Sequence, residues 1–480
     1  MSRTIKRPDV VSDLCTKGAG ELASMIRGRQ VRSREVVDAY LARIEVVNPA
    51  VNAVTVTLAD EARQAADAVD RAVAAGGAAL GPLAGVPFTI KENIDVAGSA
   101  TTWGVAALAD QVASVDAPIV ARLREAGAIP LARTNLPDFA FRWDTASGRG
   151  GRTRNPWDST RSPGGSSGGE AAALASGMTP LGLGNDLGGS LRVPSHMCGT
   201  TALRPSRGRV AHAAVTQPWP EPLAIQMTNC QGPMARRVAD LRLALGIISA
   251  PDARDPRWVP APLQSPAAKG PIRVAVVRDP AGAGIDPHVR AGLDRAAGWL
   301  ADAGYDVVDA EPPQIQGVAQ TWFDAMWADV GAMWPGMEPV AGQDEAVFVK
   351  ACLEQGVFKH VDQAGQLAAW MAIFQHASAW SQFMHDRPIV LAPVCCRRPW
   401  IVDEDVSHID EIARAMRMVV PVNILGLPSC AVPVGADEGL PQGVQLIGPR
   451  FSEDRLLDAA QAIEDRAPVI TPIQPRVAGK

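Results

Sequence analysis

A lysine at the end of an apolar run is the first residue whose position suggests chemistry. Residues 86–90 follow a turn rich in proline and glycine, and the run ends at Lys91. Burying an ammonium group costs free energy, and burial lowers a lysine pKa by several units from its reference value of ~10.4. A desolvated Lys91 would therefore offer a neutral amine that accepts a proton. The simpler interpretation is a solvated lysine at a strand edge.

A run of glycine and serine forms the second candidate segment. Residues 162–169 read SPGGSSGG and lead through Glu170 into an alanine-rich stretch. Such runs are usually flexible linkers, but a linker is not expected between a proline-fixed turn and a helix. Four glycines around Ser166 and Ser167 favour strained backbone and close approach of chains. A phosphate-binding loop is another alternative, although no Gly-Lys-Ser/Thr follows as in a P-loop.

The third segment places a serine directly after two glycines. Residues 184–194 read GNDLGGSLRVP, so Ser190 follows Gly188 and Gly189. Consecutive backbone N–H groups with little side-chain bulk can converge on one point, as an oxyanion requires. Asp186 and Arg192 can pair across the turn and hold it rigid. The alternative is a tight turn with a capping serine, whereas a dinucleotide-binding turn fits poorly because its third glycine is missing.

Ser190 is the candidate nucleophile, and a serine hydroxyl attacks poorly unless a base lies nearby. The nearest histidine in the sequence, His196, follows a proline, and no carboxylate pattern accompanies it to orient its ring. The other histidines lack metal-ligand spacing such as H-E-x-x-H. A serine–histidine hydrolase is therefore poorly supported.

Alternating strands and helices are expected to position these three segments. Apolar runs of strand length recur along the chain, and segments with helical periodicity separate them; the strands are expected at 86–90, 129–132, 181–183, 274–277, 305–308, 389–393, 429–434 and 444–447. This alternation predicts an α/β fold with a large, mostly parallel or mixed twisted β-sheet covered by helices on both faces.

Residues 317–384 interrupt the alternation. Their pattern is helical and rich in tryptophan and methionine, which predicts a helical cap or insertion. Because neither an internal repeat nor a linker is evident, residues 1–480 are expected to form a single domain.

Composition narrows the class of protein further. The chain has 480 residues, a net charge of −5 and 47% hydrophobic residues, which is typical of a globular protein and lacks the basic character of a nucleic-acid-binding one. No apolar stretch is long enough for a membrane helix, and the N-terminus lacks the apolar region of a secretory signal. The seven scattered cysteines contain no C-x-x-C and are expected to be buried free thiols. These features predict a cytoplasmic protein with no membrane or nucleic-acid partner.

Taken together and in this order, the three segments resemble the amidase signature family of serine hydrolases. The resemblance extends over most of the chain outside 317–384, through Pro82-Leu83-x-Gly85-Val86-Pro87 with Lys91 and Asn93, Thr101-Thr102, Arg152-Thr153-x-Asn155-Pro156, Asn423…Gly426-Leu427-Pro428 and Gly439-Leu440-Pro441-x-Gly443-Val444-Gln445. It implies the amidase signature fold and an enzyme that cleaves C–N bonds of amides or carbamates, and also esters, without a metal or organic cofactor.

The resemblance also implies a role for each site residue. Lys91 would be the base, Ser166 a proton relay on a cis peptide bond, and Ser190 the nucleophile that forms an acyl-enzyme. Backbone N–H groups of Leu187, Gly188, Gly189 and Ser190 would bind the oxyanion. Ser167 would support its loop through hydrogen bonds, and Asp186 with Arg192 would brace the nucleophile turn.

Two departures from the family pattern bear on the branch. Glu92 stands where the family usually has aspartate, which leaves the role of Lys91 untouched. Leu187 and His196 replace residues common in the glutamine-hydrolysing component of tRNA-dependent amidotransferases, which weakens that alternative. The whole chain looks more like bacterial hydrolases of aryl amides and carbamates, including urethanases. A non-catalytic binding protein is a third alternative, which the intact Lys91, Ser166 and Ser190 disfavour.

Substrate-binding residues are the least determined part of the prediction. Trp143, Arg209, Trp219 and Trp327 are the candidates, and the aromatic segment 317–384 would line an apolar, adaptable pocket. The alternative is that its aromatic residues form only the core of a helical layer. We expect a small-molecule amide or carbamate with an aryl or bulky apolar group beside the scissile bond, and a monomer or homodimer.

Overall fold

One mixed β-sheet is the centre of the molecule. The computed structural model describes residues 12–76, 80–217 and 221–476. Within them, eleven strands form one sheet in the order β1, β3, β2, β6, β8, β7, β12, β13, β11, β9, β10, and two short strands form a separate hairpin, β4 (Ala146–Ser147) and β5 (Gly151–Arg152). The eleven strands are β1 (Val54–Thr57), β2 (Pro87–Lys91), β3 (Ile129–Thr134), β6 (Leu181–Asp186), β7 (Thr201–Arg204), β8 (Cys230–Ala235), β9 (Arg273–Val276), β10 (Asp306–Asp309), β11 (Ile389–Pro393), β12 (Ser429–Asp437) and β13 (Leu440–Ile447).

Parallel pairs lie on either side of an antiparallel centre. Strand β2 runs parallel to β3 and β6, and β9 runs parallel to β10 and β11. The pairs from β6 through β8, β7, β12 and β13 to β11 are antiparallel, as is the edge pair of β1 and β3. The prediction of a large mixed sheet is therefore confirmed.

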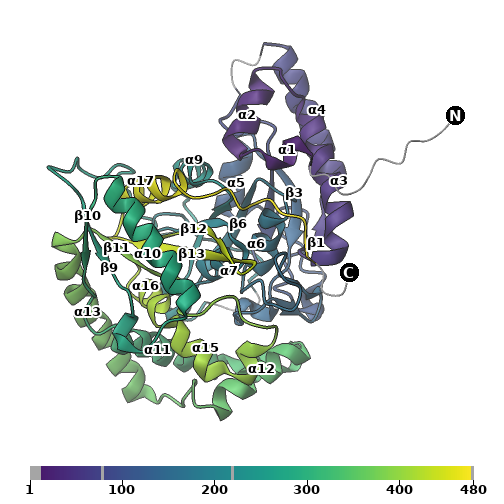
Figure 1. Cartoon of the computed structure of the whole chain (residues 1–480). Helices are drawn as coiled ribbons and strands as arrows, with labels where there is room; N and C mark the ends of the chain where they lie inside the picture. Colours follow the sequence, from purple (N-terminus) through teal and green to yellow (C-terminus); the bar gives the residue numbers. More distant parts are fainter. Residues whose placement is uncertain (1–11, 77–79, 218–220, 477–480) are drawn as a thin grey trace.

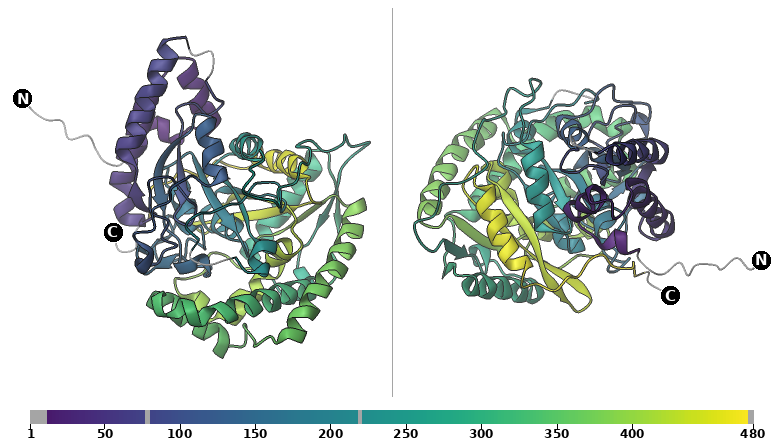
Figure 2. Two further views of the ribbon diagram at one scale, coloured as in Figure 1. Left: turned by 180° about the vertical axis from the view of Figure 1, so that it is seen from behind. Right: turned by 90° about the horizontal axis from the view of Figure 1, so that it is seen from above.

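Helices cover both faces of this sheet (Figures 1 and 2). Helix α17 packs against both α9 and α10, and these three helices contact β8, β13 and β12. Helices α6 and α7 pack on each other, α6 against β6 and α7 against β12 and β13. The α-helices are α1 (Asp13–Thr16), α2 (Ala19–Arg27), α3 (Ser33–Val51), α4 (Ala59–Ala74), α5 (Pro118–Glu125), α6 (Gly168–Ala175), α7 (Arg192–Cys198), α8 (Leu223–Thr228), α9 (Val238–Ile248), α10 (Pro287–Asp302), α11 (Ile315–Met337), α12 (Gln343–Glu354), α13 (Gln363–Asp386), α14 (Glu404–Ser407), α15 (Ile409–Ala415), α16 (Val420–Ile424) and α17 (Glu453–Glu464).

The stretch 317–384 contains most of α11 and α13 and the whole of α12. These helices curve around the lower side of the molecule in Figure 1, whereas α2, α3 and α4 project at its top. Helix α11 packs on α13 and on α16, and its Trp322, Phe323 and Trp327 are buried.

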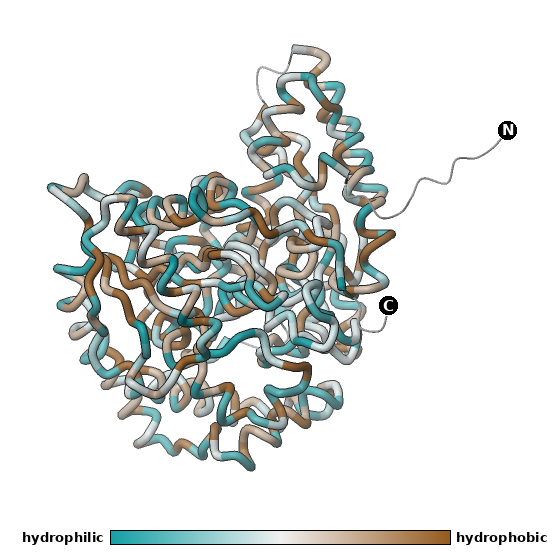
Figure 3. The backbone as a smooth tube through the Cα atoms, in the orientation of Figure 1, coloured by the Kyte–Doolittle hydropathy of each residue, from teal (hydrophilic) through white to brown (hydrophobic). Residues whose placement is uncertain are grey.

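Hydropathy follows this layered arrangement. Strands β2, β3, β6, β8, β11 and β13 are buried along their whole length, and Figure 3 shows largely hydrophobic strands at the left of the view and hydrophilic segments on the helices at the top. Burial of apolar surface at about 25 cal/mol per Å² is what holds such a sheet between its helices. Among the residues that the structure describes, no helix combines the length and apolar character that a membrane crossing requires.

Candidate active site

The three predicted segments meet where two neighbouring parallel strands end. Lys91 is the last residue of β2, and Asn185 and Asp186 are the last two of β6; the strands pair through Thr89 with Gly182 and Ile90 with Leu183. Helix α6 begins two residues after Ser166, and α7 begins two residues after Ser190. Carboxyl ends of strands are the common place for ligand sites in α/β sheets.

Close backbone approach explains the glycines of the second segment. A side chain at Gly165 would come within 2.4 Å of the Arg142 carbonyl oxygen, and one at Gly169 within 2.5 Å of the Asn135 backbone. The run is therefore not a linker but the place where three chain segments pass one another. The peptide bond between Gly165 and Ser166 is cis, as the resemblance implied.

Lys91 is fully buried and hydrogen-bonded to two groups. Its Nζ lies 2.7 Å from Ser166 Oγ and 2.7 Å from Asn185 Oδ1. Burial lowers the pKa of Lys91 well below its usual range, and the negative charges of Asp186 and Glu170 oppose this only in part. When Lys91 is neutral, one N–H donates to Asn185 while the lone pair can accept the Ser166 proton. The geometry thus suits a base rather than a solvated strand-edge lysine.

Glu170 is a buried carboxyl close to Lys91. No role is predicted for it from the sequence. Its carboxylate accepts hydrogen bonds from the hydroxyls of Thr89 and of Thr134, the latter at 2.8 Å. Burial raises the pKa of this carboxyl to about 7, against the opposite effect of these bonds and of the Lys91 charge. The proximity of Glu170 to Lys91 arises from the packing of α6 on β2, which no spacing in the sequence reveals.

Ser190 lies on the turn between β6 and α7, with 4% of its surface exposed. The Ser167 N–H donates to the Ser190 carbonyl at 3.2 Å, which joins the two serine-bearing loops. Among the described residues, no hydrogen bond joins the hydroxyls of Ser166 and Ser190. The structure thus brings Lys91 and Ser166 into direct contact and places Ser190 on the adjoining loop.

Asp186 and Arg192 form the core of the nucleophile turn. Arg192 Nε lies 2.9 Å from the Asp186 carboxylate, and both side chains are fully buried. Although burial opposes ionisation, the charge of Arg192 and the hydrogen bonds of Arg192 and Asn423 hold the pKa of Asp186 well below its usual range. The Asn423 amide also accepts from Arg192 at 2.6 Å. Asn423 stands in a motif quoted for the resemblance, but only the folded chain reveals its contact with this pair.

The backbone donors of the turn are not all equivalent. The Gly189 N–H donates to Asp186 Oδ1 at 2.8 Å, so this predicted oxyanion donor is already engaged. The N–H groups of Leu187, Gly188 and Ser190 have no such partner within the described chain. Two indoles hold the carbonyls of the turn, because Trp143 Nε1 donates to the Gly188 carbonyl at 2.9 Å and Trp322 Nε1 to the Leu187 carbonyl at 3.2 Å.

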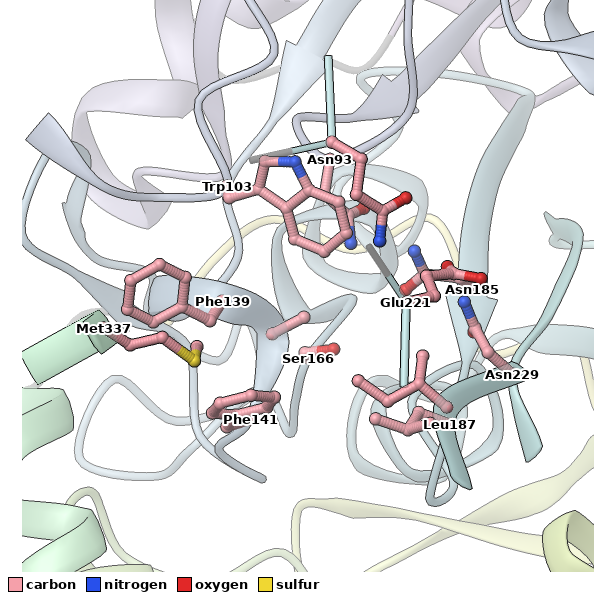
Figure 4. A pocket seen from close by; sticks show the side chains of 13 residues that line it. Asn93, Trp103, Phe139, Phe141, Ser166, Asn185, Leu187, Glu221, Asn229 and Met337 are labelled. Carbon is pink, nitrogen blue, oxygen red and sulfur yellow. The ribbon is translucent and has the colours of Figure 1, made fainter. Parts of the chain in front are cut away.

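Two pockets meet at this turn. The first, here the Ser166 pocket, encloses about 520 Å³ and is lined by Ser166, Asn185 and Leu187 together with Asn93, Trp103, Glu221 and other residues (Figure 4). The second, the Ser190 pocket, encloses about 530 Å³ and is lined by Ser190, Leu187 and Gly188 and by a largely aromatic wall that includes Trp143, Trp322, Trp327, Phe348 and Phe358. Trp327 stacks on Phe358 with ring centroids 4.4 Å apart.

The four predicted substrate-binding residues fall in different places. Trp143 and Trp327 line the Ser190 pocket. Arg209 lies outside both pockets, buried against Glu453 at 3.0 Å and donating to the Ala261 and Pro262 carbonyls. Trp219 lies outside the described residues.

His196 is engaged with backbone and not with Ser190. Its ring nitrogens lie 3.2 Å from the Gly443 carbonyl oxygen and 3.1 Å from the Arg397 carbonyl oxygen, and burial lowers its pKa. A serine–histidine arrangement is therefore absent from this site within the part of the chain that the structure describes.

Comparison with known proteins agrees with this geometry. The Amidase family model matches residues 35–457. An indoleacetamide hydrolase of Bradyrhizobium diazoefficiens is 42% identical over 465 residues, covering 94% of this chain and 87% of that protein. A component of the glutamyl-tRNA(Gln) amidotransferase of Acidothermus cellulolyticus is more distant, with 33% identity and 95% coverage of each chain. Among solved structures, a 6-aminohexanoate cyclic dimer hydrolase complexed with substrate superposes with a TM-score of 0.82 at 26% identity, covering 97% of this chain and 99% of that one.

A family match over most of the chain, a relative of high identity and coverage, and a shared fold all agree with the predicted resemblance. The chain belongs to the amidase family, the amidase signature family of serine hydrolases, and is an enzyme that hydrolyses the C–N bond of amides.

Proposed function

We propose that this enzyme hydrolyses amides of arylacetic type, indoleacetamide among them, through an acyl-enzyme on Ser190. The observation that carries the proposal is the buried Lys91 amine, 2.7 Å from the Ser166 hydroxyl and beside the nucleophile turn. A neutral amine in that position is a base that can activate a serine in the absence of histidine.

The reaction proceeds by a proton relay. Ser166 gives its proton to neutral Lys91 and takes the proton of Ser190, whose hydroxyl turns toward it. The Ser190 oxygen attacks the amide carbon, and the free N–H groups of Leu187, Gly188 and Ser190 receive the oxyanion. Gly189 contributes little because Asp186 holds its N–H. The relay then runs in reverse to protonate the leaving amine, and water hydrolyses the ester.

The acyl group binds in the Ser190 pocket. This pocket borders the nucleophile and is walled by Trp143, Trp322 and Trp327, and aromatic walls favour a flat apolar ring through stacked or edge contacts. The name of the indoleacetamide hydrolase relative, 42% identical to this chain, supports an aromatic acyl group.

A substrate panel tests the proposal. Indole-3-acetamide and phenylacetamide are expected to be hydrolysed with higher kcat/KM than acetamide or glutamine, and Ser190→Ala and Lys91→Ala are each expected to lose about 10⁴-fold or more in kcat. Ser381→Ala, an exposed serine on α13, is the matched control. Faster turnover of glutamine would favour the amidotransferase-type alternative, and near-wild-type rates in either variant would refute the role of that residue. Aryl carbamates in the same panel test the predicted carbamate and urethanase activity.

We further propose that the enzyme acts in the cytoplasm as a monomer or homodimer on a small molecule, without a nucleic-acid partner. The net charge of −5 and seven buried free thiols support this, because reduced thiols are typical of that compartment. Light scattering after size-exclusion chromatography is expected to give the mass of one or two chains.

A further inference from the structure

The two pockets divide the substrate at the scissile bond. In the proposed mechanism, on which this inference rests, the acyl carbon stays on Ser190 and the amine leaves with a proton from Ser166. The Ser190 pocket borders Ser190 but not Ser166, and the Ser166 pocket borders Ser166 but not Ser190; Ala140, Phe141 and Leu187 line both. The leaving amine therefore faces the Ser166 pocket. Ammonia would contact few of the residues that line this pocket.

Two unpartnered acceptors belong to residues that line the Ser166 pocket. The Oδ1 atoms of Asn93 and Asn229 are buried, and neither has a hydrogen-bond partner among the described residues. Asn93 is only 5% exposed. A buried amide oxygen without a donor costs free energy, so a ligand that brings N–H donors would satisfy both.

A carboxylate, that of Glu221, lies on the same side of this pocket as Asn229. Figure 4 shows Glu221 with Asn185 and Asn229 across the pocket from Phe139, Phe141 and Met337. Glu221 is mostly buried, lies 3.2 Å from His212 Nε2 and is 3.6 Å from Arg257. Although burial opposes it, contact with His212 and the charge of Arg257 lower the pKa of Glu221 to about 2, so the carboxylate is ionised.

Of the described residues that line the Ser166 pocket, Glu221 is the charged one. Arg257 is shared with Asp255, whose carboxylate lies 2.9 Å from its Nε. This basic group, with Arg207 and His212, lines an adjoining pocket on the other side of Glu221 and not the Ser166 pocket. The opposite side of the Ser166 pocket offers the rings of Phe139 and Phe141, and the faces of aromatic rings attract cations.

We infer that the amine side of the substrate carries a positive charge. The preferred substrates are then monoamides of a diamine, with the aryl acyl group in the Ser190 pocket and the distal ammonium between Glu221 and the aromatic side of the Ser166 pocket. Hydrolysis breaks the C–N bond, consumes one water, and releases the aryl acid and the diamine, whose departing nitrogen takes its proton from Ser166.

Three phenylacetamides with N-substituents of similar length test the inference: 2-aminoethyl, propyl and 2-carboxyethyl. The 2-aminoethyl amide is expected to have about tenfold higher kcat/KM than the propyl amide, as one charge-assisted hydrogen bond provides, and the 2-carboxyethyl amide is expected to be the poorest. A ratio of one or less between the 2-aminoethyl and propyl amides would overturn the inference.

Variants identify the residue responsible for the preference. Glu221→Gln is expected to reduce the ratio between 2-aminoethyl and propyl amides to near one, and Asn229→Asp, which adds a second carboxylate, to increase it. Glu438→Gln, at an exposed glutamate paired with Arg398, is the matched control and should keep the wild-type ratio. A ratio that Glu221→Gln leaves unchanged would exclude this carboxylate as the cation site.

Binding separates this inference from the proposed function. Calorimetric titration of the Ser190→Ala variant with the three amides gives the ratio of their Kd values without turnover. If wild-type enzyme hydrolyses no arylacetamide but the variant binds the 2-aminoethyl amide most tightly, only the proposed function fails. If arylacetamides are hydrolysed but the Kd values do not depend on the charge of the substituent, only the inference fails.

Discussion

Lys91 is held between opposing electrostatic effects. Burial favours its neutral form, while the charges of Asp186 and Glu170 favour the ammonium, and burial prevails. Asp186 is itself neutralised by Arg192 at 2.9 Å. Glu170, with a pKa of about 7, is therefore the carboxyl whose ionisation most directly changes the charge felt by Lys91 at neutral pH.

The acid side of the pH–rate profile is expected to report the protonation of Lys91. Because the Glu170 charge raises the Lys91 pKa, Glu170→Gln should move the acid limb of kcat/KM toward lower pH. The measurement is a pH profile of phenylacetamide hydrolysis by wild type, this variant and Glu438→Gln. An acid limb that stays in place or moves toward higher pH in Glu170→Gln would contradict the coupling.

The same pKa predicts a pH-dependent stability. Between the lowered pKa of Lys91 and the reference value, the unfolded chain binds a proton that the native chain does not, so stability rises with pH. Relative to Lys91→Met, the wild type should gain about 1.4 kcal/mol of unfolding free energy per pH unit. Urea unfolding at pH 7 and pH 8 measures this difference.

Lys350→Met, at an exposed lysine beside Glu354, is the control for this stability measurement and should show no such slope. A difference between wild type and Lys91→Met that stays constant with pH would mean that Lys91 is protonated in the native protein.

At the scale of elements, two indoles from other parts of the chain donate hydrogen bonds to the carbonyls of the nucleophile turn. Trp143 belongs to the loop after β3, which Arg142 anchors to Asp405 at 2.7 Å, and Trp322 belongs to α11. A carbonyl held toward an indole turns the N–H of the same peptide to the opposite side. The two tryptophans thus orient the peptides whose N–H groups belong to Gly188 and Gly189, besides lining the pocket.

Removing the Trp322 indole N–H is expected to lower kcat more than removing that of Trp143. Trp322→Phe should reduce kcat for acetamide about fivefold, as the loss of one hydrogen bond predicts, with a smaller change in KM. Trp143→Phe should change kcat little, because Asp186 already holds the Gly189 N–H. Trp258→Phe removes a similar indole–carbonyl bond far along the chain, to Ser249 at 3.0 Å, and serves as control. Unchanged kcat in Trp322→Phe would limit Trp322 to substrate contact.

At the scale of the whole molecule, one sheet joins segments from Val54 to Ile447. Strand β2, which carries Lys91, and the C-terminal strands β12 and β13 belong to the same sheet, and α7 packs on β13. The prediction of a single domain therefore has a direct thermodynamic consequence, since one cooperative unit unfolds in one transition.

Unfolding in urea is expected to be a single event by every probe. Loss of activity, loss of far-UV circular dichroism and exposure of the seven buried thiols to a thiol reagent should share one midpoint. The native enzyme should react with almost none of these thiols, because burial also raises the pKa of those such as Cys198 and Cys430. Thiol exposure at a lower urea concentration than the loss of circular dichroism would indicate separate units.

Much of the catalytic chemistry was predictable because it depends on local patterns. The glycines around Ser166 and Ser190, the lysine that ends an apolar strand, and the pairing of Asp186 with Arg192 six residues later all follow from residue type and short spacing. The alternation of strands and helices likewise indicated the layered fold, because periodicity reflects which face of each element is buried.

Contacts between distant segments could not be predicted in this way. Asn423 reaches Asp186 across 237 positions and Trp322 reaches Leu187 across 135. Arg209 was a reasonable substrate contact by sequence, yet it lies against Glu453 across 244 positions. The order of strands and the packing of α11 bring these residues together, and nothing in their immediate neighbours encodes it.

The sequence by itself determined the family and predicted the reactive groups, since both reside in contiguous motifs whose backbone requirements limit the residues allowed. Only the tertiary structure decided which side chains surround those groups: the buried Glu170, the two indoles, and the division into an aromatic pocket and a pocket that contains Glu221. The physical reason is that pocket walls are built by packing elements far apart in the chain, whose side chains acquire a common environment only after folding.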